Sequence, residues 1–112
     1  MSGTDEAMRA ITVVTTVATP IDADQLAGDL IDRRLAACVQ IDGPVQSHYE
    51  WAGKREVATE FRLTIKSRVG VWKELRARLL SVHPYDTPEI LMSQVDDAGE
   101  DYLRWIIDQT SS

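Results

Sequence analysis

Apolar positions recur along the chain in two kinds of pattern, one typical of strands and one typical of helices. Some segments alternate apolar and polar residues or concentrate β-branched side chains, as strands do. Others place apolar residues three and four positions apart, as amphipathic helices do. These patterns predict strands over 8–17, 38–51, 54–66 and 90–95, and helices over 20–34, 70–82 and 100–107.

Capping and turn residues mark several of these boundaries. The Thr19-Pro20 pair is typical of an N-cap followed by proline at the first helical position. Ala52-Gly53 is typical of a hairpin turn, and Asp97-x-x-Glu100 has the spacing of a capping box for the last helix. The order β-α-β-β-α-β predicts an α+β fold of the ferredoxin-like, split β-α-β type, with an antiparallel sheet, a long hairpin and an extra C-terminal helix.

The predicted hairpin is too long for a domain of this size. Each arm has about 13 residues, against a usual strand length of about 5–6. An unbroken arm would span about 43 Å, whereas the expected radius of gyration is about 13 Å. The tip, with Tyr49 and Trp51, should therefore project beyond the core and need a partner, which predicts a homo-oligomer. The alternative is that Gly43-Pro44 breaks the ribbon and folds it back.

Composition narrows the classes of partner. The 112 residues carry a formal net charge of −6, which argues against nucleic acid and against an anionic membrane surface. No apolar run approaches the length of a membrane span, and no secretory leader is visible. With Cys38 as the single cysteine, we expect no internal disulfide and a cytoplasmic protein. We expect residues 1–7 to be a flexible N-terminus and residues 8–110 to form one domain.

The segment His83-Pro84-Tyr85-Asp86-Thr87-Pro88-Glu89 carries more chemistry than a turn requires. Each proline fixes its own φ and favours extended geometry in the preceding residue. The imidazole, phenol and carboxylates are therefore expected on a rigid loop, where functional groups are common. The alternative is that this segment only ends one helix and begins the next strand.

Candidate metal ligands and catalytic groups are few. His83 and Glu89 form a candidate pair, but no CxxC, HxxxH or HxH spacing predicts a tight structural zinc site. Cys38 is expected to be a small buried apolar residue, and His48 to be exposed. A His-Tyr-Glu set could act in acid–base chemistry, yet no nucleophile elbow, P-loop or dinucleotide motif supports an enzyme. Glu60 and Lys66, with Arg62 between them, are expected to form a salt-bridge ladder.

Five segments, taken together and in order, resemble the CutA family of divalent-cation tolerance proteins. They are LAACV at 35–39, YEWAGKRE at 49–56, EFRLTIK at 60–66, HPYDTPE at 83–89 and DYLRW at 101–105. Any one of these motifs is weak, but the ordered set is specific and extends over about residues 11–107.

The resemblance implies a ferredoxin-like protomer in a compact homotrimer whose long hairpins meet at subunit boundaries. It also implies a non-enzymatic role in tolerance of divalent ions, notably copper, in the cytoplasm. Because the family's trimer is similar to that of the PII signalling proteins, the alternative function is a PII-like trimeric module that senses a small anionic ligand.

The resemblance also implies where a ligand would bind. His83 and Glu89 would be the metal ligands, with a divalent cation such as copper as the expected cofactor. In some members copper binding involves a cysteine near the end of the first strand and a His-His pair before Pro-Tyr; here Val17 and Val82 occupy the first two positions, and His83 remains. The expected intersubunit cleft is lined by Tyr49, Trp51, Lys54, Glu60, Lys66, Tyr85 and Trp105.

Overall fold

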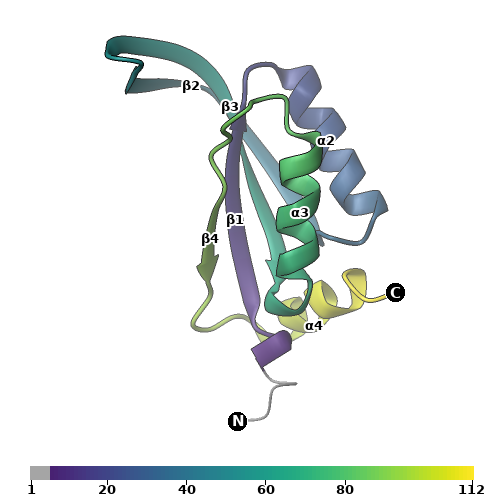
Figure 1. Cartoon of the computed structure of the whole chain (residues 1–112). Coiled ribbons are helices and arrows are strands. Elements are labelled where there is room, and N and C mark those ends of the chain that lie inside the picture. Colours follow the sequence, from purple (N-terminus) through teal and green to yellow (C-terminus); the bar gives the residue numbers. More distant parts are fainter. Residues whose placement is uncertain (1–5) are drawn as a thin grey trace.

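The computed structural model describes residues 6–112 and confirms the α+β fold (Figure 1). Its strands are β1 (Ala10–Val17), β2 (Cys38–Trp51), β3 (Lys54–Arg68) and β4 (Leu91–Gln94). Its helices are α2 (Pro20–Asp32), the short 3₁₀ helix η1 (Val69–Val71), α3 (Trp72–Val82) and α4 (Glu100–Gln109).

The four strands form one antiparallel sheet in the order β2-β3-β1-β4. Helices α2 and α3 lie on one face of the sheet (Figure 1), and the core fills the space between. Alternate residues of β1 and β3 point into this layer, because successive side chains of a strand face opposite sides. The fully buried core side chains include Ile11, Val13, Leu63, Ile65, Leu75 and Leu79.

The opposite face of the sheet is covered at one end, where Ile106 of α4 packs against Ala10 and Ala37, and within residues 6–112 no helix lies over the rest of it (Figure 1). Leu91 lies on this face, because it is paired with Val14 in the register of β1 and β4, and 61% of it is exposed. An exposed leucine on an uncovered sheet face is consistent with a partner on that side.

The β2–β3 hairpin projects beyond the core, as its length predicted (Figure 1). The molecule measures 47 × 26 × 24 Å, with a radius of gyration of 15.0 Å, above the ~13 Å of a compact chain this long. Gly43-Pro44 does not fold the ribbon back; the pairing register shifts between Asp42 and Val45, and the strands continue. Gly43 has a φ of +151°, and an added Cβ would lie 2.7 Å from Cδ1 of Phe61, so this bulge requires glycine.

One predicted helix cap is confirmed and another is wrong. Thr19 is the N-cap of α2, and its hydroxyl accepts a hydrogen bond from the Asp22 N–H at 3.1 Å. At α4 the N-cap is Gly99, without a side-chain hydrogen bond. The Asp97 carboxylate accepts instead from the neighbouring Ala98 N–H at 2.9 Å, so no capping box forms.

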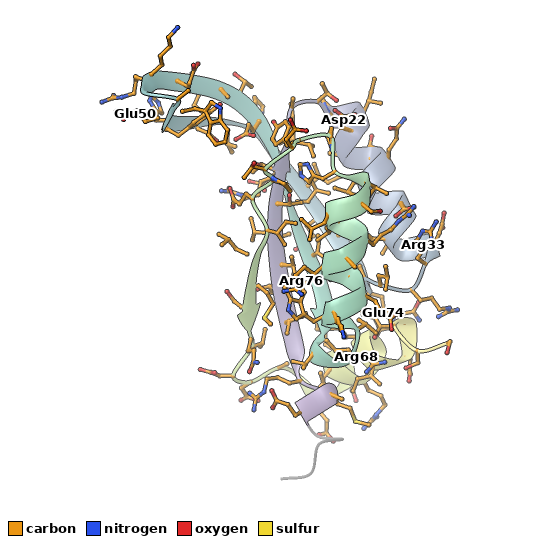
Figure 2. All side chains as sticks on the ribbon, viewed as in Figure 1. Asp22, Arg33, Glu50, Arg68, Glu74 and Arg76 are labelled. Carbon is orange, nitrogen blue, oxygen red and sulfur yellow. The ribbon has the colours of Figure 1, made fainter. Side chains whose placement is uncertain are left out.

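Arg68 ties both ends of the described chain to the sheet. Its guanidinium donates to the Thr110 hydroxyl at 2.9 Å and the Thr110 carbonyl at 3.2 Å, and to the Ala7 carbonyl at 3.3 Å. Figure 2 places Arg68 at the end of the molecule where α4 lies, away from the hairpin. Of the N-terminus expected to be flexible, residues 1–5 lie outside the described part, and Glu6 and Ala7 belong to a helical turn.

None of the helices within residues 6–112 combines the length and the apolar character needed to cross a membrane.

Candidate ligand-binding site

The loop after α3 places His83 in a buried position beside the central strand. The ring nitrogen Nε2 lies 2.9 Å from Oγ1 of Thr15, and Nδ1 accepts a hydrogen bond from the Tyr85 N–H at 3.1 Å. Because Nδ1 is an acceptor, the proton of the neutral ring is on Nε2, which donates to Thr15. Both ring nitrogens are therefore engaged within the chain.

Burial keeps His83 neutral. Desolvation lowers the pKa of His83 below its ordinary value, and it outweighs the opposing effects of a Thr16 backbone hydrogen bond and the charges of Asp22 and Glu60. Only 9% of the residue is exposed. The imidazole is thus a neutral, hydrogen-bonded part of the loop, and it fixes the backbone on which Tyr85 is carried.

Tyr85 extends from this loop to Glu60 on β3. Its hydroxyl donates to Oε2 of Glu60 at 2.8 Å, and its ring lies 5.1 Å from that of His83, centroid to centroid. Burial, followed by the hydrogen bond and charge of Glu60, raises the pKa of Tyr85 far above its ordinary value. The phenol therefore stays protonated and serves as a hydrogen-bond donor.

Glu60 is a buried carboxylate, with 8% of the residue exposed. Burial raises the pKa of Glu60, but hydrogen bonds from Ser47, Tyr85 and Thr16 outweigh it, so the pKa lies below its ordinary value. Glu60 is therefore ionised at neutral pH. Sequence analysis did not identify Ser47, Thr15 or Thr16; the only signal was a pair of threonines at the end of an otherwise apolar strand.

The hairpin adds aromatic side chains to the same face as Glu60. In the register of β2 and β3, Val45 is opposite Glu60, and Tyr49 and Trp51 follow on that face at alternate positions. Tyr49 is 44% exposed and Trp51 60% exposed. A buried anionic and hydroxyl-rich centre thus continues into an exposed aromatic strip.

A model of the protein family described as CutA1 divalent ion tolerance protein matches residues 11–109. The chain belongs to the CutA1 family. The match covers all the strands and helices that build this site, so the buried cluster is part of a CutA1 fold.

Individual CutA relatives agree with this assignment. The chain is 38% identical over 100 residues to the divalent-cation tolerance protein CutA of Pyrococcus horikoshii, covering 89% of this chain and 97% of that protein. A crystal structure of Pyrococcus horikoshii CutA1 superimposes with a TM-score of 0.88 at 37% identity, covering 91% of this chain and 99% of that one. CutA1 of Ehrlichia chaffeensis gives a TM-score of 0.90 at 26% identity, covering 93% and 97%.

The candidate metal pair of this CutA1 chain is not surrounded by other ligands. Glu89 is exposed, and its charge acts on Arg62, whose pKa is raised first by the hydrogen bond and charge of Asp42. Within residues 6–112, no group of three or more histidine, cysteine or acidic side chains is arranged to hold a metal ion. Inside one protomer, His83 therefore offers at most a single imidazole.

The predicted salt-bridge ladder on β3 is wrong. Arg62 pairs with Asp42 on β2, with 2.8 Å between Nη2 and Oδ2, and Glu60 takes its hydrogen bonds from hydroxyl groups. Two residues were not expected to be metal ligands. His48 is exposed as expected, while Cys38 is half-buried instead of fully buried.

The structure separates the remaining expected cleft residues of the CutA1 protomer. Lys54 is opposite Trp51 at the hairpin tip, whereas Lys66 is opposite Thr12 and Cys38 near the other end of β3. These two lysines are about 40 Å apart along the strand. Trp105 lies on α4, 40% exposed, and stacks on Tyr102 with the ring centroids 5.5 Å apart. Within residues 6–112, the structure therefore brings Glu60 and Tyr85 of the expected lining together next to His83, with Tyr49 close enough for its charge to act on Tyr85.

Proposed function

We propose that this chain acts in cellular tolerance of divalent cations, copper among them, as a non-enzymatic homotrimer. The observation that carries the proposal is the 38% identity to a protein named for divalent-cation tolerance, across 97% of that protein's length. The match lies over the whole fold and not over one motif, so the proposal does not depend on any single residue.

Growth under metal stress tests this function directly. A bacterial strain that lacks its own CutA protein is grown over a series of Cu²⁺ concentrations, with and without this chain. We expect the chain to restore growth at copper concentrations that inhibit the deficient strain. Equal inhibition in both strains, with the protein expressed and folded, contradicts the proposal.

Three features support self-association, which we propose to be trimeric as the family resemblance implies. The hairpin projects, its exposed residues include Trp51 and Val57, and the uncovered sheet face exposes Leu91. Exposed apolar side chains on a projecting ribbon are stabilised when a partner covers them. Light scattering at micromolar concentration should therefore give three times the 12.5 kDa of one chain. A monomeric mass is incompatible with this part of the proposal.

Copper binding is proposed at His83, with Glu89 or a second subunit completing the ligands. A single imidazole does not make a selective copper site, so the affinity is expected to be weak. Titration calorimetry of Cu²⁺ into the wild type and His83→Gln tests this, because glutamine keeps a polar side chain of similar reach and removes the imidazole. Identical isotherms would remove His83 from the site.

The alternative is a PII-like module that senses a small anionic ligand. Lys54, Lys66 and nearby arginines would bind such an anion, and the separation of the two lysines along β3 means that different subunits would have to supply them. We propose the cytoplasm as the location, although the CutA of Archaeoglobus fulgidus is described as periplasmic. Cell fractionation distinguishes the two compartments.

A further inference from the structure

Beyond Phe61, the sheet narrows to a ribbon of two strands. The pairing of β1 with β3 ends at Val17 and Phe61, whereas β2 and β3 remain paired as far as the hairpin turn. Residues 45–51 and 54–60, here called the free ribbon, therefore pair only with each other within the described part of the chain. Because two-stranded ribbons twist more than larger sheets, strand pairing alone does not fix the direction of this one.

The free ribbon leaves the core at a bulge. The register of β2 and β3 shifts between Asp42 and Val45, and Gly43 approaches β3 so closely that an added Cβ would lie 3.0 Å from the Glu60 carbonyl oxygen. A bulge bends its strand and increases the local twist. Figure 1 shows the ribbon turning away from the sheet at the end of β1, where the loop after α3 crosses. The contacts at this point therefore determine the direction of the ribbon.

Glu60 lies at the base of the free ribbon, opposite Val45, and it is the one buried residue among 45–60. The Tyr85 hydroxyl donates to its carboxylate at 2.8 Å, and the Thr16 side chain, at the end of β1, is a second donor from outside the ribbon. The ion pairs within residues 6–112 do not join the ribbon to any other element. Glu60 is therefore the point at which the core holds the ribbon.

The loop that carries Tyr85 is itself fixed to the core. The Tyr85 N–H donates to Nδ1 of His83 at 3.1 Å, and Nε2 of His83 lies 2.9 Å from Oγ1 of Thr15 on β1. Pro84 and Pro88 restrict the backbone on both sides of Tyr85. A continuous series of contacts therefore connects β1, through the loop, to the base of the ribbon.

We propose that the hydrogen bond between Tyr85 and Glu60 is a latch that fixes the direction in which the free ribbon leaves the core. The latch couples the loop at 83–89 to the hairpin tip at Lys54, six residues beyond Glu60, or about 20 Å. Over that length, a change of about 10° at the base moves the tip by roughly 3–4 Å. Breaking the bond releases the ribbon, and a movement of the ribbon displaces the loop in return. This coupling goes beyond the proposed function, and neither depends on the other.

Distances between two spin labels test the latch, because they report the position of the ribbon and not the stability of the protein. Glu50→Cys and Glu74→Cys provide the labelling sites in a Cys38→Ala background. Both glutamates are exposed, and Figure 2 shows Glu50 on the hairpin and Glu74 on α3. Labelled chains are diluted with an excess of unlabelled chains, so that each measured pair of labels lies within one chain.

The contact is then removed in the labelled chain. Tyr85→Phe removes the donor and keeps the ring, and we expect the mean distance to shift, or the distribution to widen, by about 3 Å or more. Glu60→Ala removes the acceptor and should give the same change; it decides the question if Tyr85→Phe does not fold. Asp42→Asn is the matched control, because it weakens the exposed pair with Arg62 on the other side of the bulge, and it should leave the distances unchanged.

Two results overturn the proposal. One is a distance distribution in Tyr85→Phe that is identical to that of the labelled parent chain. The other is an equal change in Asp42→Asn, which would mean that the loss of any polar contact near the bulge moves the ribbon. Copper tolerance is measured separately, so the proposed function stands or fails on its own assay.

Discussion

Replacing Tyr85 by phenylalanine tests whether the buried cluster is held by the ionised form of Glu60. The substitution removes one hydroxyl, which donates to Oε2 of Glu60 at 2.8 Å, and keeps the ring that lies against His83. A hydrogen bond to a buried charged group contributes about 1.5–3 kcal/mol. Since 8% of Glu60 is exposed, water replaces the lost donor poorly. We expect Tyr85→Phe to lower the free energy of unfolding by about 2 kcal/mol at pH 7.

The pH dependence separates this explanation from a loss of packing. The pKa of Glu60 in the folded protein lies below its ordinary value of 4.5, so Glu60 adds stability that is complete above pH 4.5 and is lost as the pH falls through the folded value. Below that value the carboxyl is protonated and the bond is between neutral groups, which contributes about 1 kcal/mol. The difference between wild type and Tyr85→Phe should therefore shrink in acid.

Urea denaturation at equal protein concentrations measures this difference, because self-association contributes to the apparent stability. Tyr102→Phe is the matched control: Tyr102 is 45% exposed and stacks on Trp105, so its hydroxyl should contribute less than about 0.5 kcal/mol. A Tyr85→Phe effect no larger than that of the control, or one that is the same at pH 7 and in acid, refutes the reasoning.

Three further substitutions test other contacts by denaturation or hydrogen exchange. Asp29→Asn should lower the free energy of unfolding by about 1 kcal/mol at pH 7. The hydrogen bonds from Arg78 are the main reason that the pKa of Asp29 is lowered from 3.8 to about 2. The difference in stability between wild type and variant should therefore disappear as the pH falls from 3.8 to about 2. Thr19→Ala should cost about 1 kcal/mol by removing the N-cap, and Thr19→Ser should cost little. Arg68→Met should speed amide exchange in α4, because the Thr110 hydroxyl and carbonyl both lose their donor; unchanged exchange would mean that packing alone holds α4.

Periodicity predicted the fold well because local patterns determine it. The alternation over β2 and β3 gave the hairpin, and the three- and four-residue spacing gave α2 and α3. The helix α4 begins at Glu100 as predicted, but the predicted capping box is wrong, because the Asp97 carboxylate accepts from the adjacent Ala98 N–H instead. Sequence spacing cannot distinguish these two conformations of a short loop.

The site was harder to predict because its contacts are non-local. Thr15 and His83 are 68 positions apart, and Tyr85 and Glu60 are 25 apart. The alternation along β3 suggested that Glu60 pairs with Arg62 and Lys66. Arg62 instead pairs with Asp42 on β2, and Glu60 accepts a hydrogen bond from Tyr85 in the loop after α3. The partners of a polar side chain on a strand are set by the neighbouring strand and by the loop that crosses its end, neither of which a single segment reveals.

Val17 and Val82 make this chain informative about metal tolerance itself. The resemblance placed a copper-binding cysteine at Val17, but Val17 has no exposed surface and packs in the core, and valine has no atom that can bind a metal ion. The chain nevertheless keeps His83 bonded to Thr15 and Tyr85 bonded to Glu60. If it restores growth in copper, tolerance does not require the three-ligand set, and the hydrogen-bonded cluster becomes the next feature of this chain to test. If it fails while folding and associating normally, the missing ligands are the simplest cause, and restoring cysteine at Val17 and histidine at Val82 should recover growth.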